Sequence, residues 1–122
     1  MSCILIVDDD VAMRRMLRAN LEAAGHEVIE AANGRKAERE LAQRTPDLLI
    51  TDIIMPDKEG IELITSLRKA RTFKILAISG GSQTMKVDFL EVAKRLGADA
   101  TMAKPFRREE LLVVVRQLLG ST

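Results

Sequence analysis

The chain alternates short, continuous apolar runs with longer stretches whose apolar residues recur every three or four positions, and it does so five times. The short runs have the length and continuity of strands that are covered on both faces. The longer stretches have the spacing of amphipathic helices. Strict alternation of this kind predicts an α/β fold, because parallel strands need helical crossover connections. We therefore expect a five-stranded, doubly wound parallel sheet with helices on both faces.

The expected elements follow one another without a linker, repeat or low-complexity segment. Strands are predicted at 3–7, 27–31, 48–51, 74–79 and 98–103, and helices at 11–24, 34–44, 61–70, a stretch ending near residue 96, and 107–119. The second strand is the more polar one, which favours an edge position. We expect a single domain over residues 1–122.

The composition argues against several classes of partner. The net charge is +1, and the chain has three Phe but no Trp or Tyr, so the basic stripe with aromatics that is typical of nucleic-acid binding is missing. No apolar run approaches the roughly 18 residues of a membrane span, and no signal peptide is visible. The single cysteine, Cys3, lies in an apolar run and predicts a buried thiol. These features indicate a cytoplasmic protein that binds neither nucleic acid nor membrane directly.

Polar residues gather where the predicted strands end. Asp8 and Asp9 follow the first strand, Asp52 follows the third, Ser79 ends the fourth and Lys104 follows the fifth. The carboxyl ends of parallel strands meet at one edge of the sheet, where ligands of such folds bind. A single Asp at a strand end is usually a turn former or a helix cap. The sequence nevertheless predicts that three carboxylates, a hydroxyl and an ammonium converge.

Metal-assisted phosphoryl transfer to a carboxylate fits this set of groups. Carboxylate oxygens with open positions beside them suit Mg²⁺, which would also offset the repulsion between the acids. A carboxylate is a competent nucleophile that forms an aspartyl phosphate. Lys104 and Ser79 would provide positive charge and a donor for the phosphoryl oxygens.

Four stretches resemble the receiver domain of two-component response regulators. These are ILIVDDD, LLITDIIMPDKEG, ILAISG and GADATMAKPF, in that order, and the resemblance extends over essentially the whole chain. The combination is specific to the family although each piece alone is not. The resemblance implies a flavodoxin-like strand order of 2-1-3-4-5.

The resemblance also implies roles for residues in the phosphoryl and metal site. Asp52 matches the phosphoacceptor, which receives its phosphoryl group from a phosphohistidine on a sensor histidine kinase or phosphotransfer protein. Asp9 matches a direct Mg²⁺ ligand, Asp8 a ligand through water, and Asp52 and the backbone carbonyl of Ile54 complete the set. Ile54 and Gly81 stand at positions that tune phosphoryl lifetime, and neither side chain can orient a water. We therefore expect slow self-dephosphorylation, and a phosphoacceptor rather than an enzyme.

The implied switch differs from the family pattern at one position. Ser79 matches the hydroxyl residue that turns toward the phosphoryl group, and Lys104 matches the lysine that contacts it, with a Lys104–Pro105 bond that is usually cis. Thr101 occupies the position of the usual aromatic switch residue. The family meets effectors or a second copy through the fourth helix, fifth strand and fifth helix, where Val113 is expected to face outward. The chain would then be a stand-alone regulator or the N-terminal part of a longer one.

Three alternatives remain at this level. Asp8-x-Asp10 resembles the start of a haloacid-dehalogenase motif, which would make the chain a Mg²⁺-dependent phosphohydrolase, but Ala12 replaces the expected Thr or Val. A flavodoxin-like cofactor module would need aromatic residues and would suffer from acids near the flavin phosphate. An interaction module that is never phosphorylated is the third. Two further residues receive structural interpretations: Asp10 as a helix N-cap and His26 as a surface residue.

Overall fold

The computed structural model describes residues 2–52, 73–79 and 97–120. Five strands and three helices lie in these ranges: β1 (Cys3–Val7), α1 (Val11–Ala23), β2 (Glu27–Ala31), α2 (Gly34–Gln43), β3 (Leu48–Asp52), β4 (Lys74–Ser79), β5 (Ala100–Ala103) and α5 (Arg108–Leu119). The predicted helices at 61–70 and before residue 97 lie outside the described residues. No helix in the described ranges is long and apolar enough to cross a membrane.

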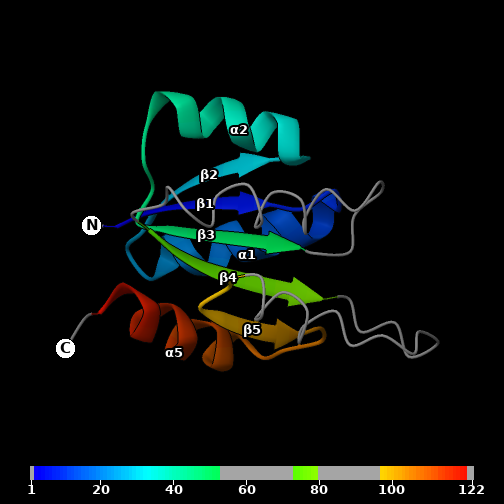
Figure 1. The fold of residues 1–122 in the computed structure, drawn as a ribbon. Coiled ribbons are helices and arrows are strands. Elements are labelled where there is room, and N and C mark those ends of the chain that lie inside the picture. The colour runs from blue at the N-terminus through cyan, green and yellow to red at the C-terminus, as the bar shows by residue number, and fades with distance from the viewer. Residues whose placement is uncertain (1, 53–72, 80–96, 121–122) are drawn as a thin grey trace.

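The strands form one parallel sheet in the order β2-β1-β3-β4-β5, which confirms the predicted order and places β2 at an edge (Figure 1). The register sets neighbouring strand ends side by side, because Val7 pairs with Thr51 and Ser79 pairs with Ala103. Residues that follow β1 and close β3 therefore meet at the same level of the sheet. All arrowheads in Figure 1 point to this end.

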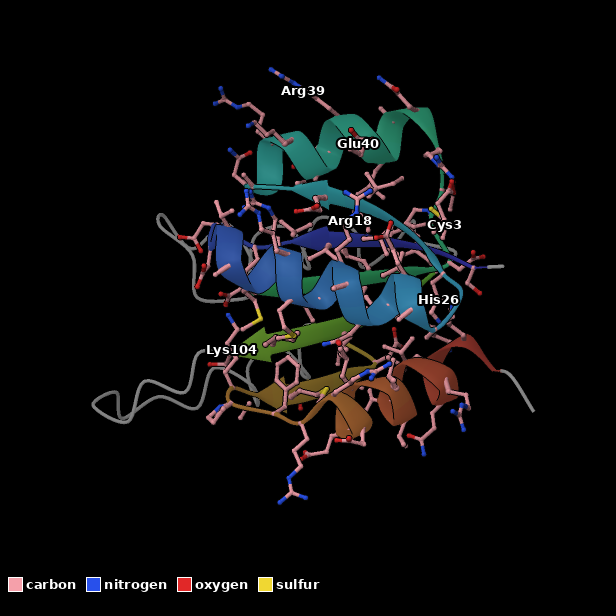
Figure 2. The ribbon with its side chains drawn as sticks, turned by 180° about the vertical axis from the view of Figure 1, so that it is seen from behind. Cys3, Arg18, His26, Arg39, Glu40 and Lys104 are labelled. Atoms are coloured by element: carbon pink, nitrogen blue, oxygen red, sulfur yellow. The ribbon has the colours of Figure 1, made fainter. Side chains whose placement is uncertain are left out.

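Alternate residues of the strands build a separate core on each face of the sheet. Ile4 and Ile6 of β1 face α1 and α5, and they pack with Leu17 and Leu111. Leu5 and Val7 face the other way, toward Ala37, Leu41 and their neighbours under α2. Figure 2, seen from behind, shows α1 and α5 side by side on the first face. Helices thus cover both faces, as the continuous apolar strands predicted.

Local capping explains where α1 and α2 start. The Asp10 side chain accepts hydrogen bonds from the N–H groups of Ala12 and Met13, which confirms the predicted N-cap of α1. Asn33 caps α2 by accepting from the N–H of Lys36. These caps fix the direction in which each chain segment leaves the carboxyl end of the sheet.

Strand β5 begins two residues later than predicted. Asp99 makes reciprocal bonds with β4 before the regular ladder starts: its N–H donates to the Ile75 carbonyl at 2.8 Å and its carboxylate accepts from the Ile75 N–H at 2.8 Å. A side chain thus replaces a backbone acceptor at this point, which shortens β5 to Ala100–Ala103. Cys3 also differs from expectation, since it is only partly buried.

Candidate functional site

Three carboxylates meet at the carboxyl end of β1 and β3. Asp8 and Asp9 follow β1 directly, and Asp52 is the last residue of β3, which is paired with β1. Each of the three offers a carboxylate oxygen within 4.8 Å of the other two. Asp8 and Asp52 are only 1% and 6% exposed, whereas Asp9 is exposed. The predicted convergence of the acids is confirmed, with two of them buried and one open to solvent.

Lys104 joins the two buried acids from the far side of the site. Its ammonium Nζ donates to Oδ2 of Asp8 and to Oδ2 of Asp52, each at 3.1 Å. The lysine follows β5, and its N–H donates to the Ser79 carbonyl at 2.8 Å, which extends the pairing between β4 and β5 by one step. The Lys104–Pro105 bond is cis, as the resemblance implied.

The environment keeps Lys104 charged. Its burial disfavours the charged form and lowers the pKa, but the nearby carboxylates of Asp52 and then Asp8 outweigh that effect, so the pKa of Lys104 is raised above its ordinary value. The ammonium therefore remains a fixed positive charge at neutral pH. It balances part of the charge of the acid cluster.

Ser79 and Thr101 occupy different levels of the neighbouring strands. Ser79 ends β4, next to the end of β3, and is 6% exposed. Thr101 is half-buried in β5, pairs with Ala77 and lies three residues before Lys104. Ser79 thus stands at the same sheet edge as Asp52 and Lys104, while Thr101 lies back from it. Ile54, the remaining predicted ligand, lies outside the described residues.

One further residue touches the site that the sequence pattern did not single out. Arg14 of α1 donates from Nη1 to the backbone carbonyl of Asp8 at 2.6 Å and from Nε to Oε1 of Glu30 at 3.1 Å. The helical periodicity placed Arg14 outside the apolar stripe, together with the exposed Arg15. The signal that distinguishes the two arginines is Glu30, a partly buried acid near the end of the edge strand β2.

The donor set suits a hard divalent cation. Octahedral Mg²⁺ binds oxygen ligands at about 2.1 Å, so opposite ligand atoms lie about 4.2 Å apart. The three carboxylate oxygens lie within 4.8 Å of one another, a spacing close enough for all of them to serve one ion, directly or through a bound water. Three carboxylates and one ammonium also leave an excess of two negative charges, which a divalent cation neutralises. The same excess would repel the phosphate of a flavin.

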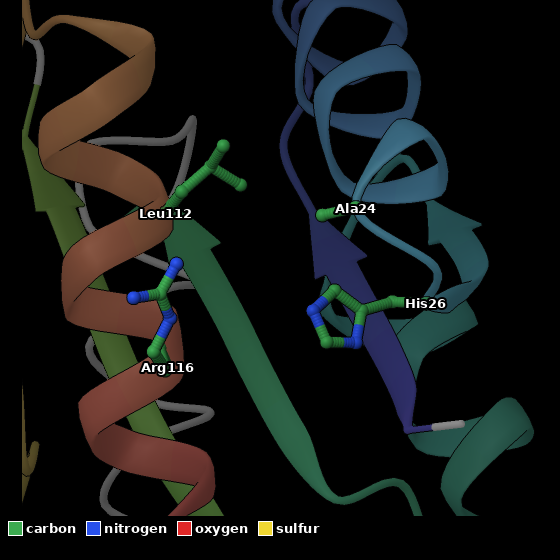
Figure 3. Close-up of a pocket in the computed structure, with 4 residues that line it drawn as sticks. All are labelled: Ala24, His26, Leu112 and Arg116. Carbon is green, nitrogen blue, oxygen red and sulfur yellow. The ribbon is translucent and has the colours of Figure 1, made fainter. Parts of the chain in front are cut away.

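A hollow lies at the end of the sheet opposite to the acid cluster. It has a volume of about 190 Å³ and is lined by Ala24, His26, Leu112 and Arg116, between the end of α1 and α5 (Figure 3). His26 is half-buried, and its Nδ1 is buried without a hydrogen-bond partner in the described ranges. The prediction of His26 as a surface residue is confirmed only in part, because α5 lies beside the turn after α1 and covers one side of the imidazole. Burial lowers the pKa of His26.

The sequence comparisons agree with this geometry. Residues 4–116 match the response regulator receiver domain family. The phosphate regulon transcriptional regulatory protein PhoB of Pseudomonas aeruginosa is 36% identical over 98% of this chain and 52% of that protein. The DNA-binding transcriptional regulator NtrC of Azospirillum brasilense is 38% identical over 97% of this chain and 24% of that protein. The chain thus spans about half of the length of the first relative and about a quarter of the second.

Solved structures of similar chains have the same fold over their whole length. A CheY-like receiver domain protein from Methanospirillum hungatei is 31% identical, with a TM-score of 0.86 and coverage of 98% of this chain and 94% of that one. The chemotaxis response regulator CheY4 of Vibrio cholerae is 30% identical, with a TM-score of 0.83 and coverage of 97% and 98%. Receiver domains use Mg²⁺ at an acidic pocket and interact with histidine kinases and effectors. With its acid cluster, its sheet order and these matches, the chain belongs to the response regulator receiver domain family.

Proposed function

We propose that Asp52 is the phosphoacceptor of a two-component pathway and takes its phosphoryl group from a phosphohistidine on a sensor kinase or phosphotransfer protein. The observation that carries this proposal is the shared contact of Lys104 with Asp8 and Asp52, inside a cluster of three carboxylates. Asp8, Asp9, Asp52 and the backbone carbonyl of Ile54 would hold Mg²⁺. When bound, Mg²⁺ supplies positive charge to the phosphoryl oxygens and orients them.

Asp52 is suited to be the nucleophile by its place and its surroundings. One of its carboxylate oxygens forms the new P–O bond as the P–N bond breaks, and the electron pair stays on the imidazole nitrogen of the donor. The Lys104 ammonium, 3.1 Å from Oδ2 of Asp52, stands beside the oxygens on which negative charge develops. With Asp52 only 6% exposed, little water competes for the site.

The switch would act through the ends of β4 and β5. Ser79 and Lys104 are already joined by a backbone hydrogen bond, so both can respond to a phosphoryl group on Asp52. Thr101, in place of an aromatic residue, moves little volume, so we expect Ser79 to carry most of the change. Val113 of α5 is 49% exposed and lies on the surface that we expect to meet an effector or a second copy. The predicted fourth helix of this surface lies outside the described residues.

We infer that residues 1–122 form one receiver domain and that output depends on partners or further domains, as in the longer relatives. The net charge of +1 and the lack of Trp and Tyr argue against direct nucleic-acid binding by this domain. A sensor kinase draws on ATP, so we expect this receiver domain to work in the cytoplasm.

We expect this receiver domain to be a phosphoacceptor with slow self-dephosphorylation. A half-life of seconds for the phosphorylated form would contradict this expectation.

A mass measurement tests the proposal. The protein is incubated with Mg²⁺ and acetyl phosphate, and intact protein is weighed with the variants Asp52→Asn and Asp47→Asn. Asp47 is a matched control because it lies at the other end of β3. A single phosphoryl adduct is expected in the wild type and in Asp47→Asn, and none in Asp52→Asn. No adduct in the wild type contradicts the proposal, and an adduct lost only in Asp8→Asn would indicate the phosphohydrolase alternative.

A further inference from the structure

Arg14 links the acid cluster to the edge strand β2 through two contacts. Its guanidinium donates to the Asp8 carbonyl at 2.6 Å and to Glu30 at 3.1 Å, from two different nitrogens. The side chain is 14% exposed, and Glu30 is 24% exposed. Glu30 lies in β2 opposite Ile6, so it faces the side of the sheet that α1 covers. Arg14 therefore spans from α1, across the end of β2, to the backbone of a predicted metal ligand.

The Asp8 residue is held from several sides by these contacts. Its N–H donates to the Ala31 carbonyl at 3.2 Å, its carbonyl accepts from Arg14, and Oδ1 of its carboxylate accepts from the Asp10 N–H at 2.8 Å. Of the two bonds made by the Asp8 backbone, the one from Arg14 comes from a side chain. That carbonyl belongs to the peptide between Asp8 and Asp9, so the bond from Arg14 constrains the backbone that carries both acids.

A second arginine offers a natural comparison. Arg18, one turn later in α1, donates to Oε2 of Glu30 at 2.8 Å and to Glu22 at 3.2 Å. It has the same charge and shares the same acidic partner, but its two contacts, to Glu30 and Glu22, do not include Asp8. Its side chain is 43% exposed. The difference between the two arginines is thus the bond to the Asp8 carbonyl.

We propose that Arg14 is a positioning residue for the cation site, which it supports by holding the peptide between Asp8 and Asp9. The inference rests on the proposed function, since it concerns the same metal site. The expected change in cation affinity on removal of Arg14 has the opposite sign to the change that loss of its charge alone would cause. Removing a nearby positive charge should strengthen the binding of a cation, whereas removing a support of its ligands should weaken it.

The test is Mg²⁺ binding measured by titration calorimetry, without any phosphodonor. We expect Arg14→Met to weaken Mg²⁺ affinity about tenfold, the lower end of the effect of losing an outer support of a metal ligand. Arg14→Lys keeps the charge but cannot donate from two separated nitrogens, so it should weaken affinity by an intermediate amount. Arg18→Met and Arg15→Met should leave affinity unchanged or slightly tighter. Melting temperatures in EDTA establish that each variant is folded.

Phosphorylation by acetyl phosphate provides a second readout. At saturating Mg²⁺ the rate of Arg14→Met should return to near the wild-type value, because Asp52 and Lys104 are untouched. Wild-type or tighter Mg²⁺ affinity in Arg14→Met overturns the inference. If Arg14→Met does not fold, Arg14→Lys decides: weaker affinity supports the inference and wild-type affinity overturns it. Wild-type protein that binds no Mg²⁺ and forms no adduct would overturn the proposed function as well.

Discussion

The two ends of the sheet use the same residue type in opposite ways. At the amino end, Asp47 accepts from the Cys3 N–H at 2.7 Å and Asp99 accepts from the Ile75 N–H at 2.8 Å, so each acid serves a separate strand. At the carboxyl end, three acids face one another within 4.8 Å and two of them share one lysine. Figure 2 shows these ends apart, with Lys104 at one and Cys3 and His26 at the other.

The difference teaches that the environment of an aspartate, rather than its presence at a strand end, indicates function. Asp47 and Asp99 are exposed and satisfy backbone groups, which is a structural role. Asp8 and Asp52 are buried beside other acids, an arrangement that costs stability unless a cation compensates. Such a loss of stability is typical of functional sites, where the chemistry requires the residues that cause it.

The largest expected effect comes from removing the shared lysine. Lys104→Met should slow phosphorylation of Asp52 by acetyl phosphate about 100-fold or more, since a preorganised charge beside the reacting oxygens is lost. Mg²⁺ binding should become tighter, because the competing ammonium is gone. Initial rates from intact mass measure the first effect and calorimetry the second. If Lys104→Met were phosphorylated as fast as Asp47→Asn, the lysine at the carboxyl end would have no special role in the reaction.

Magnesium should stabilise the protein through the carboxyl end alone. At a free Mg²⁺ concentration 100 times the dissociation constant, the free energy of unfolding should rise by about 2.7 kcal/mol. Urea unfolding with and without Mg²⁺ measures this. Asp9→Asn should lose most of the increase, and Asp47→Asn should keep it. An unchanged midpoint in the wild type would contradict a cation site.

Without Mg²⁺, neutralising an acid should have opposite effects at the two ends. Asp52→Asn should raise the free energy of unfolding in EDTA by about 1 kcal/mol, because repulsion falls while Lys104 keeps its contact with Asp8. Asp47→Ala should lower it by about 1 kcal/mol, because the Cys3 N–H loses its acceptor. If both variants lowered the free energy of unfolding, the carboxyl-end cluster would not be strained.

The smallest expected effect is a pH dependence of stability that arises from His26, at the amino end of the sheet. Burial lowers the pKa of His26 in the folded protein, so between its folded and unfolded pKa the unfolded state binds more protons. Stability should therefore be unaffected by His26 above its unfolded pKa of about 6.5 and should fall as the pH drops below it. Unfolding in EDTA at pH 5 and pH 7.5 measures this, and His26→Gln should show a smaller difference. The opposite slope would contradict the burial of this imidazole.

The sequence predicted those features that depend on local pattern and on strand direction. Alternating apolar runs predicted the parallel sheet, and polar residues after successive strands predicted that Asp8, Asp52 and Lys104 converge. The strand order came from the family resemblance, because periodicity does not determine which strands are neighbours. The predicted ligand role of Ile54 concerns a residue outside the described ranges.

Features that depend on the reach of side chains between distant elements were not predictable. The Arg14 bond to the Asp8 carbonyl requires α1 to cross the end of β2 at a particular height. The burial of His26 depends on α5, about 90 residues further along the chain, packing next to the turn after α1. Helical periodicity shows which side of a helix is polar, but it does not show which polar residues find partners.

The bridge made by Lys104 also has a consequence for ion selectivity. The two buried acids already share an ammonium, which is itself a monovalent cation, so sodium or potassium would offer them no charge advantage. A divalent ion matches the remaining excess of two negative charges in the cluster. At equal distance a divalent ion interacts with this excess charge twice as strongly as a monovalent ion does, so we expect the cluster to favour divalent ions even where monovalent ions are far more abundant.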